Sequence, residues 1–371
     1  MRITKVERYP LCIPFQTPYK IATAYYSHQP IVIVKVYTDE EVVGFGEACP
    51  AYEFTGETLH TVKNILEERI APSIVNQDPF DIEKITMKMD EATVGNPSAK
   101  ASIDMACYDI MGKATRRPVH KLIGGLFRDW LPVTGELGIT DLEESLKKCR
   151  HDVQQNVSVL KVKVGESFEK DLEKVKAIRE ALGPDIRIRL DANQGWKRPT
   201  KAIKVIKRLE KYNPEFVEQP ISSWDFEGLS RIRRSVDTPI ALDESVQSPF
   251  DAFRAISSEA CDIISIKLMK SGGIWNALKI NAIAESAGVS CHMGTMLETS
   301  IGVSANVHVA AATRNIEFWD LDLPTAEHGL VDDTAIGLER FIKAGSLTMK
   351  VPEEPGLGVS LKIGTFEKYK S

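Results

Sequence analysis

The sequence predicts an α/β fold in which a barrel of alternating strands and helices follows a smaller α+β domain. The first observation is a set of charged residues in the second half of the chain, spaced by 28, 27, 25 and 24 residues: Lys163, Asp191, Glu218, Asp243 and Lys267. Each ends a short β-branched, apolar segment, and a helix-like segment follows most of these. Residues at the carboxyl ends of strands form the active site of a (β/α) barrel.

The second observation is the number of strand-like segments. Eight of them begin near residues 131, 159, 186, 214, 239, 262, 289 and 316. They alternate with amphipathic segments such as residues 169–181 and 199–211. Parallel strands need such crossovers, and eight of them close a barrel. We therefore expect the barrel in residues 126–325.

The first domain is expected in residues 1–125. Three strand-like segments fill the first fifty residues, and helical patterns follow at 57–70, 81–90 and 98–115. Strands followed by helices, without alternation, indicate an α+β domain. The polar segment 16–30 and the turn-rich segment 50–56 are predicted to be lid loops.

The last segment, residues 326–371, is expected to return to the first domain. It contains a helical pattern at 332–344 and a strand-like segment, L-T-M-K-V, at 347–351.

The composition is that of an ordinary globular protein, for which the cytoplasm is the expected compartment. The net charge of -5 argues against a nucleic-acid or anionic-membrane surface. No apolar run approaches the roughly 18–20 residues that span a bilayer, and the first residues lack the apolar block of a signal peptide. The six cysteines are scattered, which favours reduced thiols over a zinc site.

The acids of the evenly spaced set predict a magnesium site. Asp191, Glu218 and Asp243 follow three adjacent strands, so their carboxylates are expected to converge. Three hard oxygen ligands suit Mg²⁺, which keeps positions open for water and substrate oxygens. Such a metal can hold a substrate carboxylate and stabilise the dianion that forms when the α-proton leaves.

The lysines predict a base on each side of this metal. Because side chains alternate along a strand, Lys161 and Lys163 share the inward face. Lys267 enters from the opposite side of the barrel mouth, and two bases on opposite faces of one carbon can invert it. A lysine must be neutral to accept a proton. We expect the neighbouring charge of Lys161, together with the metal, to lower the pKa of Lys163.

These motifs together resemble the enolase superfamily, in its muconate-lactonizing subgroup. The matching segments are K-V-K at 161–163, D-A-N at 191–193, E-Q-P at 218–220, D-E-S at 243–245 and I-K-L-M-K-S-G-G-I at 266–274. G-F-G-E-A at 44–48 and S-A-K-A-S-I-D-M-A at 98–106 extend the resemblance into the first domain.

This resemblance implies a (β/α)₇β barrel beneath an α+β capping domain. It also implies one Mg²⁺ held by Asp191, Glu218 and Asp243, with Lys163 and Lys267 as the acid/base pair. Lys161 matches the supporting lysine, and Asn193 and Glu244 stand beside the metal ligands. Barrels of this family often assemble, so we expect a homo-oligomer.

The eighth strand narrows the choice of substrate. Asp320-Leu321-Asp322 resembles the D-x-D with which dipeptide epimerases hold a substrate α-ammonium group, and two carboxylates facing a pocket suit a cationic amine.

The specificity residues leave the side chain open. Ala24 stands where the alanyl-glutamate branch has an arginine, so alanyl-glutamate is not the expected preference. Tyr26 and Phe54 favour an apolar side chain, whereas Glu53 favours a basic one. The residues expected to line the specificity pocket after the seventh strand are His292, Met293, Thr295, Met296 and Leu297. Lys270 is expected to point away from Lys267 or to lie in a loop.

The leading interpretation is a Mg²⁺-dependent dipeptide epimerase. Within the same superfamily the alternatives are an N-acyl amino acid racemase, an o-succinylbenzoate synthase and a muconate cycloisomerase, none of which needs a clamp for a free ammonium. A Schiff-base aldolase using Lys267 is an alternative from another class. A non-catalytic barrel scaffold would have no reason to gather three acids.

Overall fold

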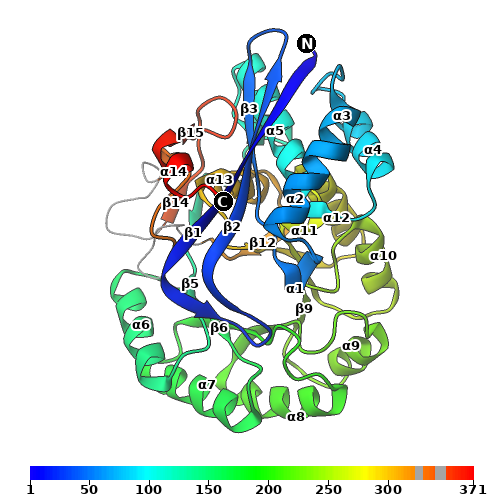
Figure 1. Cartoon of the computed structure of the whole chain (residues 1–371). Helices are drawn as coiled ribbons and strands as arrows, with labels where there is room; N and C mark the ends of the chain where they lie inside the picture. The colour runs from blue at the N-terminus through cyan, green and yellow to red at the C-terminus, as the bar shows by residue number, and fades with distance from the viewer. Residues whose placement is uncertain (322–328, 339–347) are drawn as a thin grey trace.

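A computed structural model describes residues 1–321, 329–338 and 348–371 (Figure 1). The chain starts with an antiparallel sheet in the order β1-β2-β3 (Ile3–Lys20, Tyr25–Thr38 and Val43–Ala48). The helices that follow are α1 (Tyr52–Thr55), α2 (Leu59–Ile65), α3 (Ala71–Ile74), α4 (Ile82–Ala92) and α5 (Pro97–Thr115), with a π-helical turn at Leu66–Ile70. This is the α+β domain that the sequence predicts.

The central strand β2 joins this domain to the rest of the molecule because it is buried on both faces. Val32 and Val34 pack in the core formed with helices α2 to α5. Ile31 and Ile33 belong instead to the core that runs through the barrel. On β3, a Cβ added at Gly46 would lie 1.8 Å from the carbonyl oxygen of Ser102, so only glycine allows α5 to approach this closely.

The segment 16–30, expected as a lid loop, is the end of the β1–β2 hairpin, and its role as a lid stays a prediction. The two strands remain paired at Tyr19↔Tyr26 and Lys20↔Tyr25, beyond a register shift after Pro14. The turn is closed by a hydrogen bond from Ile21 N to Ala24 O (2.9 Å). Pairing between the two strands gives the backbone N–H and C=O groups hydrogen-bond partners, so this polar segment can remain extended. The segment 50–56 contains the single turn α1.

The barrel is a parallel eight-stranded sheet in sequence order, from β5 to β12. Its strands are β5 (Gly135–Leu137), β6 (Val159–Lys163), β7 (Arg187–Asp191), β8 (Pro214–Glu218), β9 (Ile240–Leu242), β10 (Ile263–Ile266), β11 (Ser290–Met293) and β12 (Ile316–Trp319). The connecting helices are α6 (Leu142–Gln154), α7 (Phe168–Leu182), α8 (Pro199–Leu209), α9 (Phe226–Arg233), α10 (Pro249–Ser257), α11 (Leu268–Ser271) with α12 (Ile274–Ser286), and α13 (Ser300–Ala312). Short 3₁₀ turns lie at Val119–Leu122 and Glu210–Tyr212.

Seven helical connections join these eight strands, which confirms the (β/α)₇β topology. The first and last strands are linked beyond their ends by a hydrogen bond from Thr134 N to Leu321 O (2.9 Å). Figure 1 shows helices α6 to α10 in an arc around the strands, with the β1–β2 hairpin crossing in front.

The segment expected to begin the first barrel strand near residue 131 is divided in two. Its first part, β4 (Trp130–Pro132), pairs with β14 (Thr348–Lys350) from the tail, and only β5 belongs to the barrel. The tail also contains β13 (Ala335–Ile336), β15 (Ser360–Leu361) and α14 (Ile363–Lys368).

The tail reaches β1 through isolated bridges at Leu11↔Lys370 and Phe15↔Leu330. A helix was expected at 332–344, but β13 occupies part of that range, and residues 339–347 lie outside the described part. Among the described helices, none combines the length and apolarity that crossing a bilayer requires.

Candidate active site

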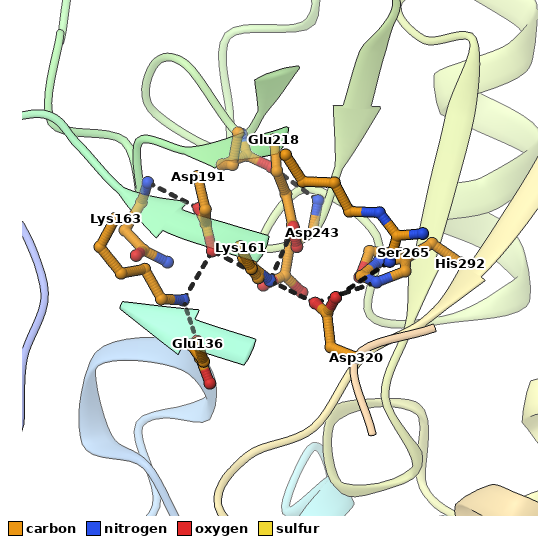
Figure 2. A network of polar contacts seen from close by, with 12 residues as sticks. Glu136, Lys161, Lys163, Asp191, Glu218, Asp243, Ser265, His292 and Asp320 are labelled. Atoms are coloured by element: carbon orange, nitrogen blue, oxygen red, sulfur yellow. Dashed lines mark hydrogen bonds and ion pairs between the residues drawn. The ribbon is translucent and has the colours of Figure 1, made fainter. Parts of the chain in front are cut away.

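The evenly spaced charged residues lie at the carboxyl ends of consecutive barrel strands. Lys163, Asp191 and Glu218 end β6, β7 and β8, and Asp243 and Lys267 directly follow β9 and β10. Each is at most 5% exposed. The first four gather around one centre in Figure 2. Charged side chains that are buried this deeply need partners of opposite charge. Here the lysines and the acids are partners for one another.

Lys161 occupies that centre. Its Nζ lies 3.2 Å from Asp191 Oδ2, 2.8 Å from Glu218 Oε2 and 2.7 Å from Asp320 Oδ2. Burial would lower the pKa of Lys161, but the charges of Asp320, Glu218 and Asp191 outweigh it and hold the pKa well above the usual value. Lys161 is therefore a fixed positive charge that holds carboxylates from three strands together.

Lys163 contacts acids on both neighbouring strands. Its Nζ lies 2.7 Å from Asp191 Oδ2 and 3.0 Å from Glu136 Oε1 on β5. Glu136 was not among the residues expected in the site, because the three-residue strand around it has no clear apolar pattern. Its position beside Lys163 makes it part of the candidate site.

Lys267 is paired with a different acid. Its Nζ lies 2.6 Å from Asp243 Oδ2 and 4.5 Å from the centroid of the Phe54 ring. A lysine over an aromatic ring gains a favourable cation–π interaction. The ammonium of Lys267 is thus held between a barrel acid and the capping domain.

The charge of Lys161 lowers the pKa of Lys163, as expected, but it does not decide the net direction of the shift. Burial is the largest single effect and lowers the pKa of both Lys163 and Lys267, but the surrounding acidic groups together, chiefly Asp191 for Lys163 and Asp243 for Lys267, more than offset it. Both pKa values therefore lie above the ordinary value. The expectation combined the neighbouring lysine with a bound metal, and the effect of that metal on the two pKa values stays a prediction.

The acids fit a divalent cation. Glu218 and Asp243 are fully buried, and none of their four carboxylate oxygens accepts a hydrogen bond of good geometry. Together with Asp191 they present hard oxygen ligands, which suit Mg²⁺. Among the described residues, the group whose ligand atoms all lie within 4.8 Å of one another is Glu218, His292 and Asp320. Asp191, Glu218 and Asp243 do not form such a group here, so a metal held by these three acids stays a prediction.

Asn193 and Glu244 lie beside the acids, as the supporting residues were expected to. The backbone N–H of Asn193 donates to Asp191 Oδ1 (3.0 Å), and its Nδ2 donates to Glu244 Oε1 (3.3 Å). Burial raises the pKa of Glu244 to about 8, and the charges of Asp243 and Asp191 add to this rise.

Lys270 corrects another expectation, since it lies in α11 and contacts the same acid as Lys267. It is completely buried, and its Nζ donates to the carbonyl oxygens of Asp243, Val246 and Ser265 (2.5, 2.6 and 2.8 Å). Its Nζ also lies 3.0 Å from Asp243 Oδ1. Strand β10 gives way to α11 at this point, and the helical period turns the residue inward.

Asp320 belongs to a buried network that the sequence did not reveal. Arg189 Nη1 lies 3.3 Å from Asp320 Oδ1, and Arg189 Nε donates to Glu215 (2.6 Å). His292 Nε2 lies 2.9 Å from Asp320 Oδ2, and its Nδ1 contacts Ser265 Oγ (3.0 Å). Figure 2 shows His292 directed at Asp320, so His292 lies inside the barrel and not along the specificity pocket.

A cavity of about 420 Å³ brings both catalytic candidates to one space. Its lining residues come from the hairpin, α1, the barrel strands and the segment after β11: Tyr19, Ile21, Tyr26, Gln29, Ala51, Phe54, Glu136, Lys163, Lys267, Thr295, Met296 and Leu297. Five of the expected substrate-binding residues are among them.

The other expected substrate-binding residues lie elsewhere. Ala24 is half-buried in the hairpin turn, Glu53 accepts a hydrogen bond from Tyr26 (3.1 Å), and Asp320 is in the buried network. None of these three lines the cavity in the described part of the chain. Asp322 lies outside the described residues.

Comparison with known families agrees with this architecture. Residues 4–124 match the mandelate racemase / muconate lactonizing enzyme N-terminal domain, and residues 144–364 match the enolase C-terminal domain-like family. The chain belongs to the enolase superfamily. Its relatives include chloromuconate and muconate cycloisomerases, which places this enolase-superfamily member in the muconate-lactonizing subgroup and confirms the resemblance.

Similarity to individual members of the superfamily extends over nearly the whole chain. The chain is 36% identical to the N-succinyl-L-Arg/Lys racemase of Bacillus cereus, over 99% of this chain and 98% of the relative, and the crystal structure of that racemase superposes with a TM-score of 0.95. It is 39% identical to the hydrophobic dipeptide epimerase of Enterococcus faecalis, over 97% of this chain and 100% of the relative.

Two further comparisons concern dipeptide epimerases. The structure of the Enterococcus faecalis V583 dipeptide epimerase, complexed with Mg and the dipeptide L-Leu-L-Tyr, is 40% identical in sequence, covers 97% of this chain and 100% of that chain, and has a TM-score of 0.91. The L-Ala-D/L-Glu epimerase of Clostridium acetobutylicum is 39% identical over 94% of this chain and 96% of the relative. The relatives are racemases, epimerases and cycloisomerases, and the chain is an isomerase.

Proposed function

We propose that the protein is a Mg²⁺-dependent dipeptide epimerase that inverts the α-carbon next to the terminal carboxylate. The observation that carries this proposal is that Lys163 and Lys267 line one cavity. They come from the second and sixth strands of an eight-stranded barrel, which lie opposite each other. An α-carbon bound between them has an amine on each face, as inversion by proton removal and return requires.

The acids have two roles in this scheme. A divalent cation held by Asp191, Glu218 and Asp243 would supply positive charge to the substrate carboxylate as the α-proton leaves. Asp191 also contacts Lys163, and Asp243 contacts Lys267. A carboxylate that shares its charge with a cation stabilises a neighbouring ammonium less, so a bound cation would lower the pKa of both lysines towards the range of a base.

Lys161 acts by charge and position. Its ammonium contacts acids from β7 and β8 and Asp320 beyond β12, so it fixes their spacing. A carboxylate bound at the barrel mouth would meet this charge, which stabilises the negative charge that builds up during proton removal.

Similarity to two dipeptide epimerases at 39% identity supports a dipeptide as the substrate. The second candidate is an N-acyl amino acid racemase, which the similarity to the N-succinyl-L-Arg/Lys racemase favours. The relatives, which are racemases, epimerases and cycloisomerases, give no support to imine formation by Lys267.

Alanyl-glutamate is not the preferred dipeptide in this proposal. Apart from the two lysines, the charged residue on the cavity wall is Glu136, which would repel a second carboxylate. Tyr26 and Phe54 present rings to the same space.

The test is incubation of the enzyme with Mg²⁺ and pooled L,L-dipeptides in D₂O, followed by mass spectrometry. A dipeptide substrate gains one deuterium at its carboxyl-terminal α-carbon and yields a second diastereomer. A parallel pool of N-succinyl amino acids decides between the two candidates: labelling confined to that pool would replace the epimerase with the racemase.

Two further expectations concern the compartment and the oligomeric state of the enzyme. We expect the enzyme to work in the cytoplasm, consistent with six free cysteines, of which five are buried. We also expect a homo-oligomer, which light scattering on the purified protein would test: a monomer at working concentration would contradict it.

A further inference from the structure

Two hollows meet at the first barrel strand. The cavity with the two lysines adjoins a larger hollow of about 940 Å³. Tyr19, Glu136, Thr295 and Leu297 line both, so they form the boundary between them. A substrate held between the lysines has this second space beside it.

Glu136 has one carboxylate oxygen to spare at this boundary. Its Oε1 accepts a hydrogen bond from Tyr19 Oη (2.7 Å) and contacts Lys163 Nζ (3.0 Å). Within the described residues, no hydrogen bond or ion pair involves Oε2. The side chain is 12% exposed and lines both hollows. An acceptor in such a place interacts strongly with a cationic donor.

A second acid lies deeper in the larger hollow. Glu298 lines it and is only 2% exposed. Its Oε2 accepts a hydrogen bond from Met296 N (2.8 Å). Its Oε1 has no hydrogen bond of good geometry, although the Asn306 side chain interacts with this carboxylate. A buried acceptor without a partner is costly, and a ligand that donates to it recovers that cost.

The lysines on the wall of the larger hollow already have partners. Lys20 Nζ lies 3.0 Å from Glu166, and Lys148 Nζ lies 3.1 Å from Asp152. Among the described residues that line the hollow, Glu298 Oε1 is a buried acceptor without a hydrogen bond of good geometry, which favours a positively charged ligand.

We propose that the larger hollow is a subsite for the cationic side chain of the residue whose α-carbon is inverted, with Glu136 at its entrance and Glu298 inside it. This inference rests on the proposed dipeptide epimerase activity. Glu136 contacts Lys163, and Lys163 flanks the substrate α-carbon, so the second carboxylate oxygen of Glu136 can bind the side chain of that substrate residue. A lysine or arginine side chain leaving that carbon passes Glu136 first.

The experiment compares kcat/KM for L-Ala-L-Lys, L-Ala-L-Arg, L-Ala-L-Leu and L-Ala-L-Glu, from the rate of α-deuteration in D₂O with Mg²⁺. The wild type should have a kcat/KM for the two basic dipeptides about tenfold or more above that for L-Ala-L-Leu, the difference expected of one charge-assisted hydrogen bond. L-Ala-L-Glu should have the lowest kcat/KM of the four.

Two variants locate the subsite. Glu298→Gln should raise KM for L-Ala-L-Lys by about tenfold and change KM for L-Ala-L-Leu less than threefold. Glu136→Gln should also raise KM for L-Ala-L-Lys relative to KM for L-Ala-L-Leu. The loss of the contact with Lys163 can lower kcat as well, but it would do so for every substrate. The matched control is Glu143→Gln on the exposed face of α6, which should leave all four constants unchanged.

The outcomes separate the two claims. If L-Ala-L-Leu is the best substrate and both variants lower kcat/KM equally for all dipeptides, the cationic subsite is wrong and the epimerase stands. If the wild type deuterates none of the four, the epimerase proposal fails first, and the subsite inference falls with it.

Discussion

The interior of the barrel and the rim of the cavity are built in different ways. In the interior, Lys161, Asp191 and Glu218 are almost completely buried and are held by ion pairs between neighbouring strands. The rim is made mainly of neutral side chains, such as Tyr26 and Phe54, from the capping domain. One parallel sheet thus sets the positions of the reacting groups, whereas segments far apart in the chain shape the space for the substrate.

The two regions are nevertheless joined by specific hydrogen bonds. From the capping domain, Gln29 Nε2 and Cys49 Sγ both donate to Met296 O (3.2 and 3.1 Å). Glu47 accepts from the backbone N–H and the hydroxyl of Thr299 (2.8 and 2.7 Å). The rim residues that follow β11 are therefore held by the capping domain, and changes there should alter specificity before they alter chemistry.

The largest effect should come from the interior lysines. Lys163→Ala and Lys267→Ala each remove one acid/base group, and epimerisation should fall by about 10³-fold or more in kcat. Chiral chromatography of the product measures this. Circular dichroism should show both variants folded, and turnover within tenfold of the wild type in either one would contradict the two-base scheme.

The next effect concerns the stability of the interior. Arg189→Met leaves Asp320 and Glu215 without this partner, and breaking a buried ion pair typically costs about 3–5 kcal/mol. Urea unfolding should show a loss of that order. The control is Arg234→Ala, whose partner Glu259 is 3.8 Å away on the surface. Exposed pairs contribute about 0–1 kcal/mol, so equal losses in both variants would remove the contrast between interior and surface.

The contact between the capping domain and the rim should depend on pH. Burial raises the pKa of Glu47 from 4.5 to about 8, although hydrogen bonds from Thr299 oppose the rise. The folded state therefore binds this proton more tightly than the unfolded chain does. Its stabilising contribution is complete below about pH 4.5 and is lost as the pH rises towards 8.

Glu47→Gln removes this titration, so the unfolding free energy of the variant should fall less steeply from pH 5 to pH 8 than that of the wild type. Urea titrations at several pH values measure the slopes. Parallel curves for the two proteins would show that Glu47 does not hold the proton in the folded state.

The smallest effect should come from the rim. Phe54→Leu removes the ring that Lys267 Nζ approaches at 4.5 Å. A partly exposed cation–π contact contributes about 0.5–1 kcal/mol, so kcat/KM should fall about two- to fivefold. Steady-state kinetics with the best dipeptide measures it. A loss as large as that of Lys267→Ala would mean that Phe54 belongs with the reacting groups.

The sequence predicted the parts of the site that follow strand periodicity. Lys161 and Lys163 alternate along β6, and Asp191 and Glu218 end runs of apolar residues, so their inward direction followed from the period of two. Arg189 shares the inward face with Asp191 by the same rule, a signal that would have revealed it.

The remainder could not be predicted from periodicity. Lys270 points inward because β10 gives way to α11 immediately after Lys267, and the change of period was not visible in the sequence. Glu136 lies in a strand of only three residues. The hairpin end at 16–30 has the polar composition of a loop although it is mostly strand. Its backbone groups are hydrogen-bonded between β1 and β2, and several of its side chains line the cavity, so its composition reflects its place in the tertiary structure.

The most direct test of the account is the stereochemistry of α-proton exchange in the two lysine variants. L,L and L,D forms of one labelled dipeptide are incubated separately in D₂O with Mg²⁺ and Lys163→Ala or Lys267→Ala, and α-deuteration is followed by ¹H NMR. Two bases on opposite faces predict that each variant still exchanges one diastereomer, that the two variants retain opposite ones, and that neither converts L,L into L,D. If both variants retain exchange of the same diastereomer, the lysines do not flank the α-carbon, and the central claim is contradicted.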